Sequence, residues 1–138
     1  MTEVAGNPNC FICGQNNPSG LHLKFSCDSS GKAISEFIIP EHLIGYDGIF
    51  HGGLITAVLD DTMFYAVMQD NPDIMTVNIN ISFKSPAYTG TFVRAEGEVT
   101  GQQGRVISAI GRLFDKETLL SEAEGKFVIV SPEKTKPR

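Results

Sequence analysis

The sequence predicts an α+β fold in which one antiparallel β-sheet curves around one long, buried α-helix. Three observations support this prediction: two strand candidates precede the helix, the helix is apolar on almost every side, and four strand candidates follow it. A helix of about 17 residues spans about 26 Å, which is long enough to lie across a strongly curved sheet. The 138 residues are enough for one domain with a substantial core.

The chain opens with a loop-like segment. Residues 1–18 are dense in Gly, Asn and Pro and contain the Cys-x-x-Cys pair Cys10 and Cys13. The first strand candidates, "LHLKFSC" and "AISEFIIP", are joined by the turn "SSGK" and are predicted to form a hairpin. At the other end, residues 131–138 are polar and contain Pro, so a disordered tail is expected.

The strand candidate "TVNINISFK" shows the clearest period of two in the chain. Its alternation predicts one apolar face and one polar face: Val77, Ile79, Ile81 and Phe83 against Thr76, Asn78, Asn80, Ser82 and Lys84. Three further candidates, "TFVRAEGEVTG", "RVISAIGRLFD" and "LLSEAEGKFVIV", are joined by short turns. Together the four segments predict an antiparallel meander.

The helix is predicted from about Gly52 to Gln69 and carries two adjacent acids, Asp60 and Asp61. Apolar residues occupy most of its circumference, which is typical of a helix buried nearly all round. A buried ionised carboxylate costs several kcal/mol unless it is paired or its pKa shifts, and no Lys or Arg lies within four positions of either acid. Either an acid reaches solvent or a backbone group at a groove edge, or it works as a nucleophile or general base in a partly dry cleft.

The helix begins with His51-Gly52-Gly53. Free N–H groups and the positive end of the helix dipole make a helix N-terminus attractive to anions, and glycine allows a ligand to approach the backbone closely. An N–H directed at a carbonyl oxygen would stabilise the negative charge that develops during nucleophilic attack.

Three motifs, "HGGLITAVLDD", "SFKSP" and "CFICGQNNPSGLHLKF", together resemble the hotdog-fold acyl-CoA thioesterases of the phenylacetate-degradation type and the larger thioesterase superfamily. The resemblance implies a hotdog domain over residues 19–130. It implies that the Gly52 N–H polarises the thioester carbonyl, that His51 shapes this turn, that Asp60 attacks or activates water, and that Thr76 orients the water. Many relatives carry Asn or Gln where this chain has Gly45.

Substrate contacts are expected from Gly53, Asp61, Lys84, Ser85 and Arg105. Lys84 and Arg105 are the candidates for the phosphates of coenzyme A, and Ser85 follows Lys84 directly. Arg94 and Arg112 are weaker candidates, and Leu54, Met63, Phe64 and Tyr65 either line an acyl tunnel or are plain core. A net charge of −5 argues against non-specific nucleic-acid binding and leaves room for a local basic patch.

The spacing between Gly52 and Asp60 predicts a shared site. Eight residues of one helix separate them by about 12 Å, whereas a thioester must lie within about 3 Å of both the oxyanion donor and the attacking group. Two antiparallel copies satisfy both requirements, so we expect a homodimer with two equivalent sites, with further pairing into tetramers left open.

The cysteines allow two interpretations. Cys10 and Cys13 have the spacing of a zinc knuckle that His22 or Cys27 would complete. A second Cys-x-x-Cys is missing, and His22 and Cys27 are predicted on opposite faces of a strand, which favours reduced thiols in a packed N-terminal cap. The expected hydrolysis requires no metal and no redox cofactor.

The expected function is hydrolysis of an acyl-CoA thioester to a free acid and coenzyme A, and the alternative is an acyl-CoA sensor that binds without cleaving. An acyl-CoA hydratase ranks last because no Asp-x5-His match occurs. The first ten residues, "MTEVAGNPNC", lack the basic and apolar regions of a signal peptide, which favours a cytoplasmic protein. The apolar stretches are also too short for a membrane span.

Overall fold

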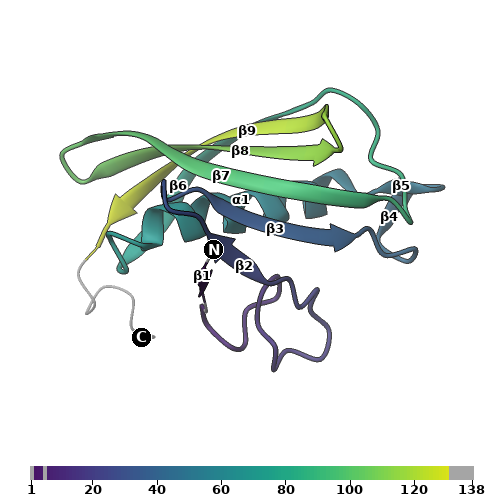
Figure 1. Ribbon diagram of the computed structural model, residues 1–138, viewed down its shortest axis with the longest axis horizontal. Coiled ribbons are helices and arrows are strands. Elements are labelled where there is room, and N and C mark those ends of the chain that lie inside the picture. Colours follow the sequence, from purple (N-terminus) through teal and green to yellow (C-terminus); the bar gives the residue numbers. More distant parts are fainter. Residues whose placement is uncertain (1, 5, 131–138) are drawn as a thin grey trace.

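A computed structural model describes residues 2–4 and 6–130 of the chain, so the tail predicted at 131–138 lies outside the described residues. A curved antiparallel sheet packs against one helix, α1 (Gly52–Met68), as Figure 1 shows. This is the predicted α+β architecture. No helix among the described residues combines the length and apolar character needed to cross a membrane.

The main sheet has seven strands in the order β1-β2-β3-β7-β8-β9-β6, and a separate hairpin, β4-β5, precedes the helix. β6 is therefore an edge strand that pairs only with β9 among the described residues. The strands are β1 (Thr2–Val4), β2 (Phe25–Cys27), β3 (Ala33–Ile38), β4 (Ile44–Tyr46), β5 (Ile49–Phe50), β6 (Ile74–Phe83), β7 (Phe92–Gln103), β8 (Val106–Asp115) and β9 (Thr118–Ile129).

The helix and the four long strands after it lie within two residues of their predicted bounds. The first hairpin is confirmed, since β2 pairs antiparallel with β3, but β2 is only three residues long and begins at Phe25 instead of Leu21. The N–H groups of Leu21 and Leu23 donate to the carbonyls of Phe11 and Ile12, at 2.9 Å each. The backbone before β2 is therefore bonded to the N-terminal loop instead of to β3. The short strands β1, β4 and β5 were not predicted.

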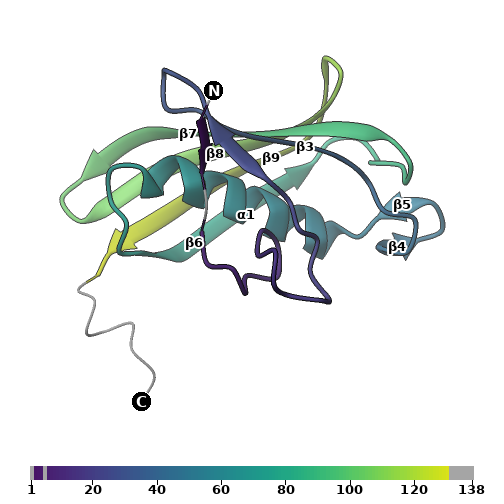
Figure 2. The ribbon, with the colours of Figure 1, turned by 60° about the horizontal axis from the view of Figure 1, so that its bottom comes forward.

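The core lies between α1 and the inner face of the sheet. Val58, Leu59 and Met63 of the helix are completely buried against inward-facing side chains that include Leu113 and Phe127. Glycines in the strands let the helix come close: a Cβ at Gly97 would lie 2.7 Å from the carbonyl oxygen of Thr62. Figure 2 turns α1 to the front and shows it lying along the sheet.

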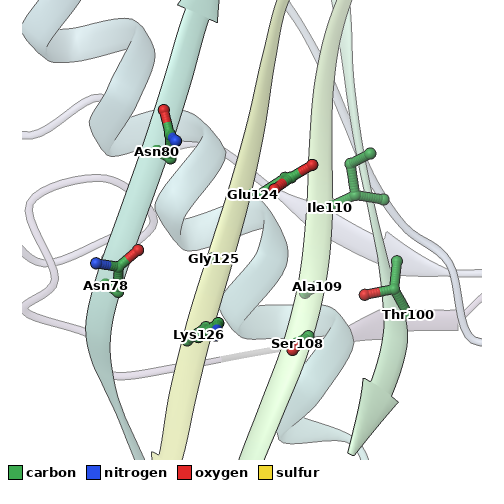
Figure 3. A pocket seen from close by; sticks show the side chains of 9 residues that line it. All are labelled: Asn78, Asn80, Thr100, Ser108, Ala109, Ile110, Glu124, Gly125 and Lys126. Carbon is green, nitrogen blue, oxygen red and sulfur yellow. The ribbon is translucent and has the colours of Figure 1, made fainter.

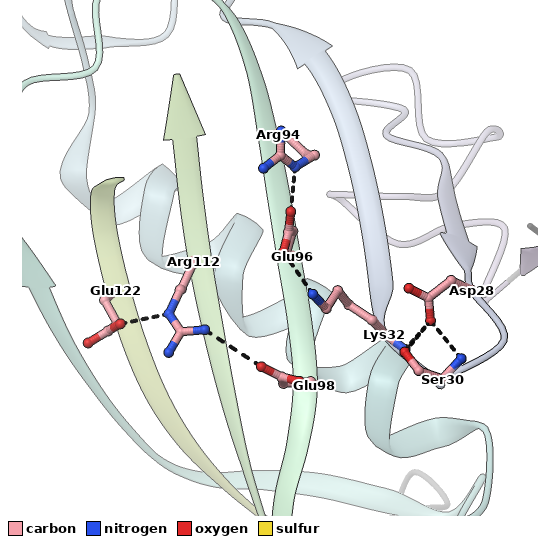
Figure 4. A network of polar contacts seen from close by, with 8 residues as sticks. All are labelled: Asp28, Ser30, Lys32, Arg94, Glu96, Glu98, Arg112 and Glu122. Carbon is pink, nitrogen blue, oxygen red and sulfur yellow. Dashed lines mark hydrogen bonds and ion pairs between the residues drawn. The ribbon is translucent and has the colours of Figure 1, made fainter. Parts of the chain in front are cut away.

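The outer face of the sheet is polar. Figure 4 shows two clusters of ion pairs on it: Glu96 with Arg94 and Lys32, and Arg112 with Glu98 and Glu122. A hollow of about 370 Å³ lies across β6, β9, β8 and β7 (Figure 3), and its polar lining includes Asn78, Asn80, Glu124 and Lys126. The sheet separates this hollow from α1, so it is remote from the acids of the helix.

Candidate active site

The start of α1 leaves one backbone N–H available. His51 is the N-cap, and its Nδ1 accepts the Gly53 N–H at 2.9 Å. The N–H groups of Leu54 and Ile55 both donate to the His51 carbonyl at 3.0 Å. The Gly52 N–H has no acceptor within the described part of the chain. Gly52 is thus the position of the His-Gly-Gly turn whose N–H can meet a ligand, whereas the Gly53 N–H is already engaged.

A mostly apolar pocket of about 350 Å³ adjoins Gly52. Phe83 closes one side, since a Cβ at Gly52 would lie 3.2 Å from Cζ of its ring. Lys84 and Ser85 line the same pocket, and their N–H groups both donate to the Leu120 carbonyl, at 2.8 and 3.1 Å. The structure therefore brings three of the predicted site residues together around one pocket: Gly52, Lys84 and Ser85.

Asp60 lies farther along α1 and faces the edge strand. The Thr76 hydroxyl donates to Oδ1 of Asp60 at 2.8 Å, so the two predicted residues are in direct contact. Asp60 is half-buried. Burial raises the pKa of Asp60, and the hydrogen bond from Thr76 partly opposes this rise. The result is a carboxylate that is held in one orientation and only partly hydrated, as nucleophiles and general bases often are.

A β-bulge explains how Thr76 reaches Asp60. The strict alternation predicted Thr76 on the polar face with Asn78, and that assignment is wrong. Thr76 pairs with Phe127 and Asn78 pairs with Lys126, which leaves Val77 as the extra residue. Directly paired residues of neighbouring strands point to the same side. Thr76 therefore points inward with the buried Phe127, while Val77 is 58% exposed.

Asp61 points into different surroundings. One carboxylate oxygen of Asp61 and the sulfurs of Cys10 and Cys13 all lie within 4.8 Å of one another. Burial raises the pKa of Asp61 to about 6; a hydrogen bond with Cys13 opposes this, and the charge of Asp60 adds to it. The two neighbouring acids thus lie in different sites, one at the sheet edge and one under the N-terminal loop. The contact between Cys13 and Asp61 was not predicted from the sequence. The Cys-x-x-Cys motif was the one feature that could have indicated a site in this loop.

The predicted basic residues are bonded to groups of the sheet, and the predicted tunnel residues belong to α1 itself. Arg105 follows the β7–β8 turn and donates from Nε and Nη2 to the Ile129 carbonyl, at 3.0 and 2.7 Å. Arg94 and Arg112 are engaged in the ion pairs of the outer face. Of the four tunnel candidates, Met63 and Tyr65 are buried in the core, and Tyr65 stacks on Phe25 with ring centroids 4.3 Å apart. Leu54 and Phe64 are half-buried and pack against that core.

Gly45, where the resemblance led us to expect an amide side chain, lies beside the N-cap. A Cβ at Gly45 would lie 3.2 Å from Cδ2 of His51. A side chain at this position would therefore press against the imidazole of the N-cap residue. The predicted departure from the family pattern thus lies in direct contact with the start of α1.

Comparison with known proteins agrees with this architecture. The family model of the thioesterase superfamily matches residues 47–122, which hold α1 and most of the sheet. The acyl-coenzyme A thioesterases THEM4 of Bos taurus and Mus musculus are both 32% identical to this chain, over 83% and 75% of its length. The chain spans about half the length of these relatives, 48% and 45% respectively.

Solved structures share the fold. A thioesterase superfamily protein superimposes with a TM-score of 0.81 at 20% identity, covering 88% of this chain and 62% of its own. A variant of the phenylacetic acid degradation protein PaaI from Thermus thermophilus gives a TM-score of 0.72 at 18% identity, covering 78% of this chain and 93% of its own. The chain belongs to the thioesterase superfamily and has the hotdog fold.

Proposed function

We propose that this chain hydrolyses acyl-CoA thioesters, with Asp60 as the nucleophile or general base and the Gly52 N–H as the oxyanion donor. The observation that carries the proposal is the Thr76–Asp60 hydrogen bond, 2.8 Å long. It fixes a partly buried carboxylate beside the edge strand β6. The THEM4 thioesterases support the choice of an acyl-CoA substrate.

The spacing of the two groups requires a second copy of the chain. Gly52 and Asp60 belong to one uninterrupted helix and lie about 12 Å apart along it. Edge strand β6 offers the surface for pairing, because its outer N–H and C=O groups have no neighbouring strand in the described chain. Three of its apolar side chains are at least half exposed: Met75 at 50%, Val77 at 58% and Phe83 at 54%. Such an edge is a template for strand addition.

A two-fold axis near the middle of β6 would complete the site. Antiparallel pairing then places the Thr76 end of one strand beside the Phe83 end of the other. Thr76 contacts Asp60, and the Phe83 ring lies against Gly52. The carboxylate of one protomer would therefore meet the pocket and free N–H of its partner. This pairing yields two equivalent sites, each built from both protomers.

The chemistry follows from this arrangement. Asp60, or a water that it deprotonates, attacks the thioester carbonyl carbon, and the Gly52 N–H stabilises the negative charge on the carbonyl oxygen. The C–S bond then breaks, and the coenzyme A sulfur leaves and takes up a proton. Direct attack by Asp60 gives an acyl–aspartyl anhydride, which water hydrolyses. The pocket beside Gly52 accepts apolar substrate groups, and Lys84 at its rim faces the phosphates.

The direct test is release of free thiol from a panel of acyl-CoAs, measured with a thiol reagent. The Asp60→Asn variant should fold and lose about 100-fold or more in kcat, the typical contribution of a positioned acid or base. An unchanged rate would remove Asp60 from the mechanism. If the unmodified protein binds acyl-CoA tightly but releases no thiol, hydrolysis is refuted and the sensor function is supported.

Subunit sharing is tested by complementation. The Asp60→Asn protein is mixed with a Gly52→Val protein, whose added side chain enters the space of the Phe83 ring. Each parent should be nearly inactive. In a random mixture half of the dimers are mixed, and each mixed dimer has one intact site of two, so about a quarter of the original activity should return. No recovery, with exchange of subunits verified, would show that each site belongs to one chain.

A further inference from the structure

The strongest unassigned feature is the cluster of Cys10, Cys13 and Asp61 between the N-terminal loop and α1. Each residue contributes one potential ligand atom, and the three atoms lie within 4.8 Å of one another. The cysteines are free thiols. We propose that these three side chains bind a single zinc ion that fastens the N-terminal loop to the catalytic helix.

The loop backbone holds both thiols on the same side. The Cys10 N–H donates to the Asn7 carbonyl at 3.1 Å, and the Gly14 N–H donates to the Cys10 carbonyl at 2.8 Å. The turn is tight, because a Cβ at Gly14 would lie 2.3 Å from the Cys10 nitrogen. These bonds shape the loop without any ion. The two sulfurs are therefore arranged for a ligand before it binds, which reduces the entropic cost of binding.

The third ligand comes from the helix. Oδ2 of Asp61 is buried and has no hydrogen-bond partner in the described part of the chain. A buried carboxylate oxygen without a donor is costly, and a thiol is only a weak donor. A cation held by the Asp61 carboxylate and the two sulfurs would stabilise this buried group. The orphaned atom is an observation independent of the Cys-x-x-Cys spacing, and it belongs to the carboxylate that lies beside both sulfurs.

The ligand chemistry selects the metal. Two thiolates and one carboxylate suit zinc, whereas calcium and magnesium prefer oxygen ligands alone. Loss of two thiol protons would accompany zinc binding. A fourth ligand would lie beside Cys13, on the side of the Tyr65 hydroxyl. A pocket of about 130 Å³, lined in part by Gly6, Cys13, Gln15 and Tyr65, adjoins this position and gives room for a water.

The sequence favoured reduced thiols without a metal, and the proposed site also differs from the zinc knuckle that was the alternative. His22 and Cys27 were the candidates to complete a zinc knuckle, and neither belongs to the cluster. Nε2 of His22 lies 2.6 Å from the Asn17 carbonyl oxygen, and Cys27 is buried in β2. Asp61 replaces them because α1 passes directly beneath the loop. The ion would link Cys10 and Cys13 to Asp61, which is far from them in the sequence. Asp61 directly follows the proposed catalytic acid, Asp60.

Elemental analysis tests the proposal on the 138-residue chain, purified without a metal-affinity column. We expect one zinc ion per chain, either as isolated or after incubation with zinc and removal of the excess. In cobalt-substituted protein, sulfur ligation should give a near-ultraviolet charge-transfer band. Absence of bound zinc after incubation, or of that band, would overturn the proposal, and neither measurement depends on enzymatic activity.

Two matched pairs of variants locate the ion. Cys13→Ser and Asp61→Asn should weaken zinc binding by more than about 100-fold, since even outer-shell changes at metal sites cost about 10- to 100-fold. Cys27→Ser and Asp60→Asn change the same residue types outside the cluster and should retain one zinc. Equal zinc binding by all four variants would show an adventitious ion and refute the site. Should Cys13→Ser fail to fold, the cobalt spectrum of Asp61→Asn decides, because loss of one oxygen ligand alters it only if Asp61 binds the metal.

Discussion

At the scale of single residues, the chain shows how two neighbouring acids acquire different surroundings. Successive side chains on a helix diverge by about 100°, so Asp60 faces the edge strand while Asp61 faces the N-terminal loop. Asp60 has a hydroxyl donor and remains half-buried. Asp61 lies beside two sulfurs, and one of its oxygens has no partner among the described residues. The dipeptide therefore belongs to two sites, and only Asp60 has the contacts expected of the attacking group.

The contribution of Thr76 can be measured by removing its hydroxyl. Thr76→Val keeps the shape of the side chain but loses the hydrogen bond to Asp60. A hydrogen bond to a charged group is worth about 1.5–3 kcal/mol, so kcat should fall by about 10- to 100-fold. Loss of the same bond should also lower the thermal unfolding midpoint by several degrees, whereas Thr76→Ser should retain most activity. Equal rates for the Val and Ser variants would contradict a role for the hydroxyl.

At the scale of elements, close approach of the helix to the sheet depends on strand glycines. Gly97 lies under the backbone of α1, where an added Cβ would be 2.7 Å from the Thr62 carbonyl oxygen. Gly101 lies on the same strand with nothing within 4 Å of an added Cβ. Packing of the helix therefore requires glycine at position 97 but not at position 101 of the same strand.

This contrast gives a stability prediction. Gly97→Ala should lower the free energy of unfolding by about 1–3 kcal/mol, because the helix must move to relieve the overlap. Gly101→Ala should leave it within about 0.5 kcal/mol. Chemical denaturation of both variants measures the difference. Similar stabilities would show that α1 shifts at no cost.

The ion pairs of the outer face make a separate contribution that depends on pH. Burial tends to raise the pKa of Glu96, but Arg94 and Lys32 outweigh it and hold the pKa below the ordinary value of 4.5. A carboxyl with a lowered native pKa stabilises the fold above its unfolded pKa, and this stabilisation is lost as the pH falls through the native value.

Replacement of Glu96 tests that linkage. At pH 7, Glu96→Gln should cost at most about 1 kcal/mol, since these pairs are partly exposed. The difference between the two proteins should disappear as the pH falls below 4.5. Unfolding midpoints measured from pH 7 to the acid limit provide the comparison. A difference that persists in acid would show that Glu96 acts by packing and not by charge.

At the scale of the whole molecule, the proposed reaction depends on a surface that a single chain leaves uncovered. β6 ends the sheet with apolar side chains exposed, and the two halves of the proposed site lie near its two ends. Pairing two copies along β6 buries the edge and assembles the site in one step. Function and association are then linked through the same strand.

A charge on this edge should separate folding from activity. Val77 is 58% exposed, so Val77→Lys should fold as the unmodified chain does. A lysine there opposes strand addition, and both the dimer in sedimentation experiments and most thiol release should be lost. Val99→Lys, at a 44% exposed valine of β7, is the control and should retain both. If the Val77→Lys protein remains dimeric and active, the interface does not lie along β6.

The sequence alone determined the elements that periodicity encodes. A helix apolar on almost every side and strands with a period of two are local patterns, and α1 and the four long strands follow them closely. The His-Gly-Gly start and the acid on the helix were recognisable for the same reason, since each motif lies within one element. The short strands β1, β4 and β5 were missed because two or three residues are too few to show a period.

Only the tertiary structure decided which residues meet across elements. The bulge at Val77 turns Thr76 toward Asp60, and strict alternation had placed Thr76 on the other face. The packing of the N-terminal loop on α1 brings Cys13 to Asp61, 48 positions away in the sequence. Register shifts and loop packing depend on contacts between distant segments, and no local pattern in the sequence contains that information.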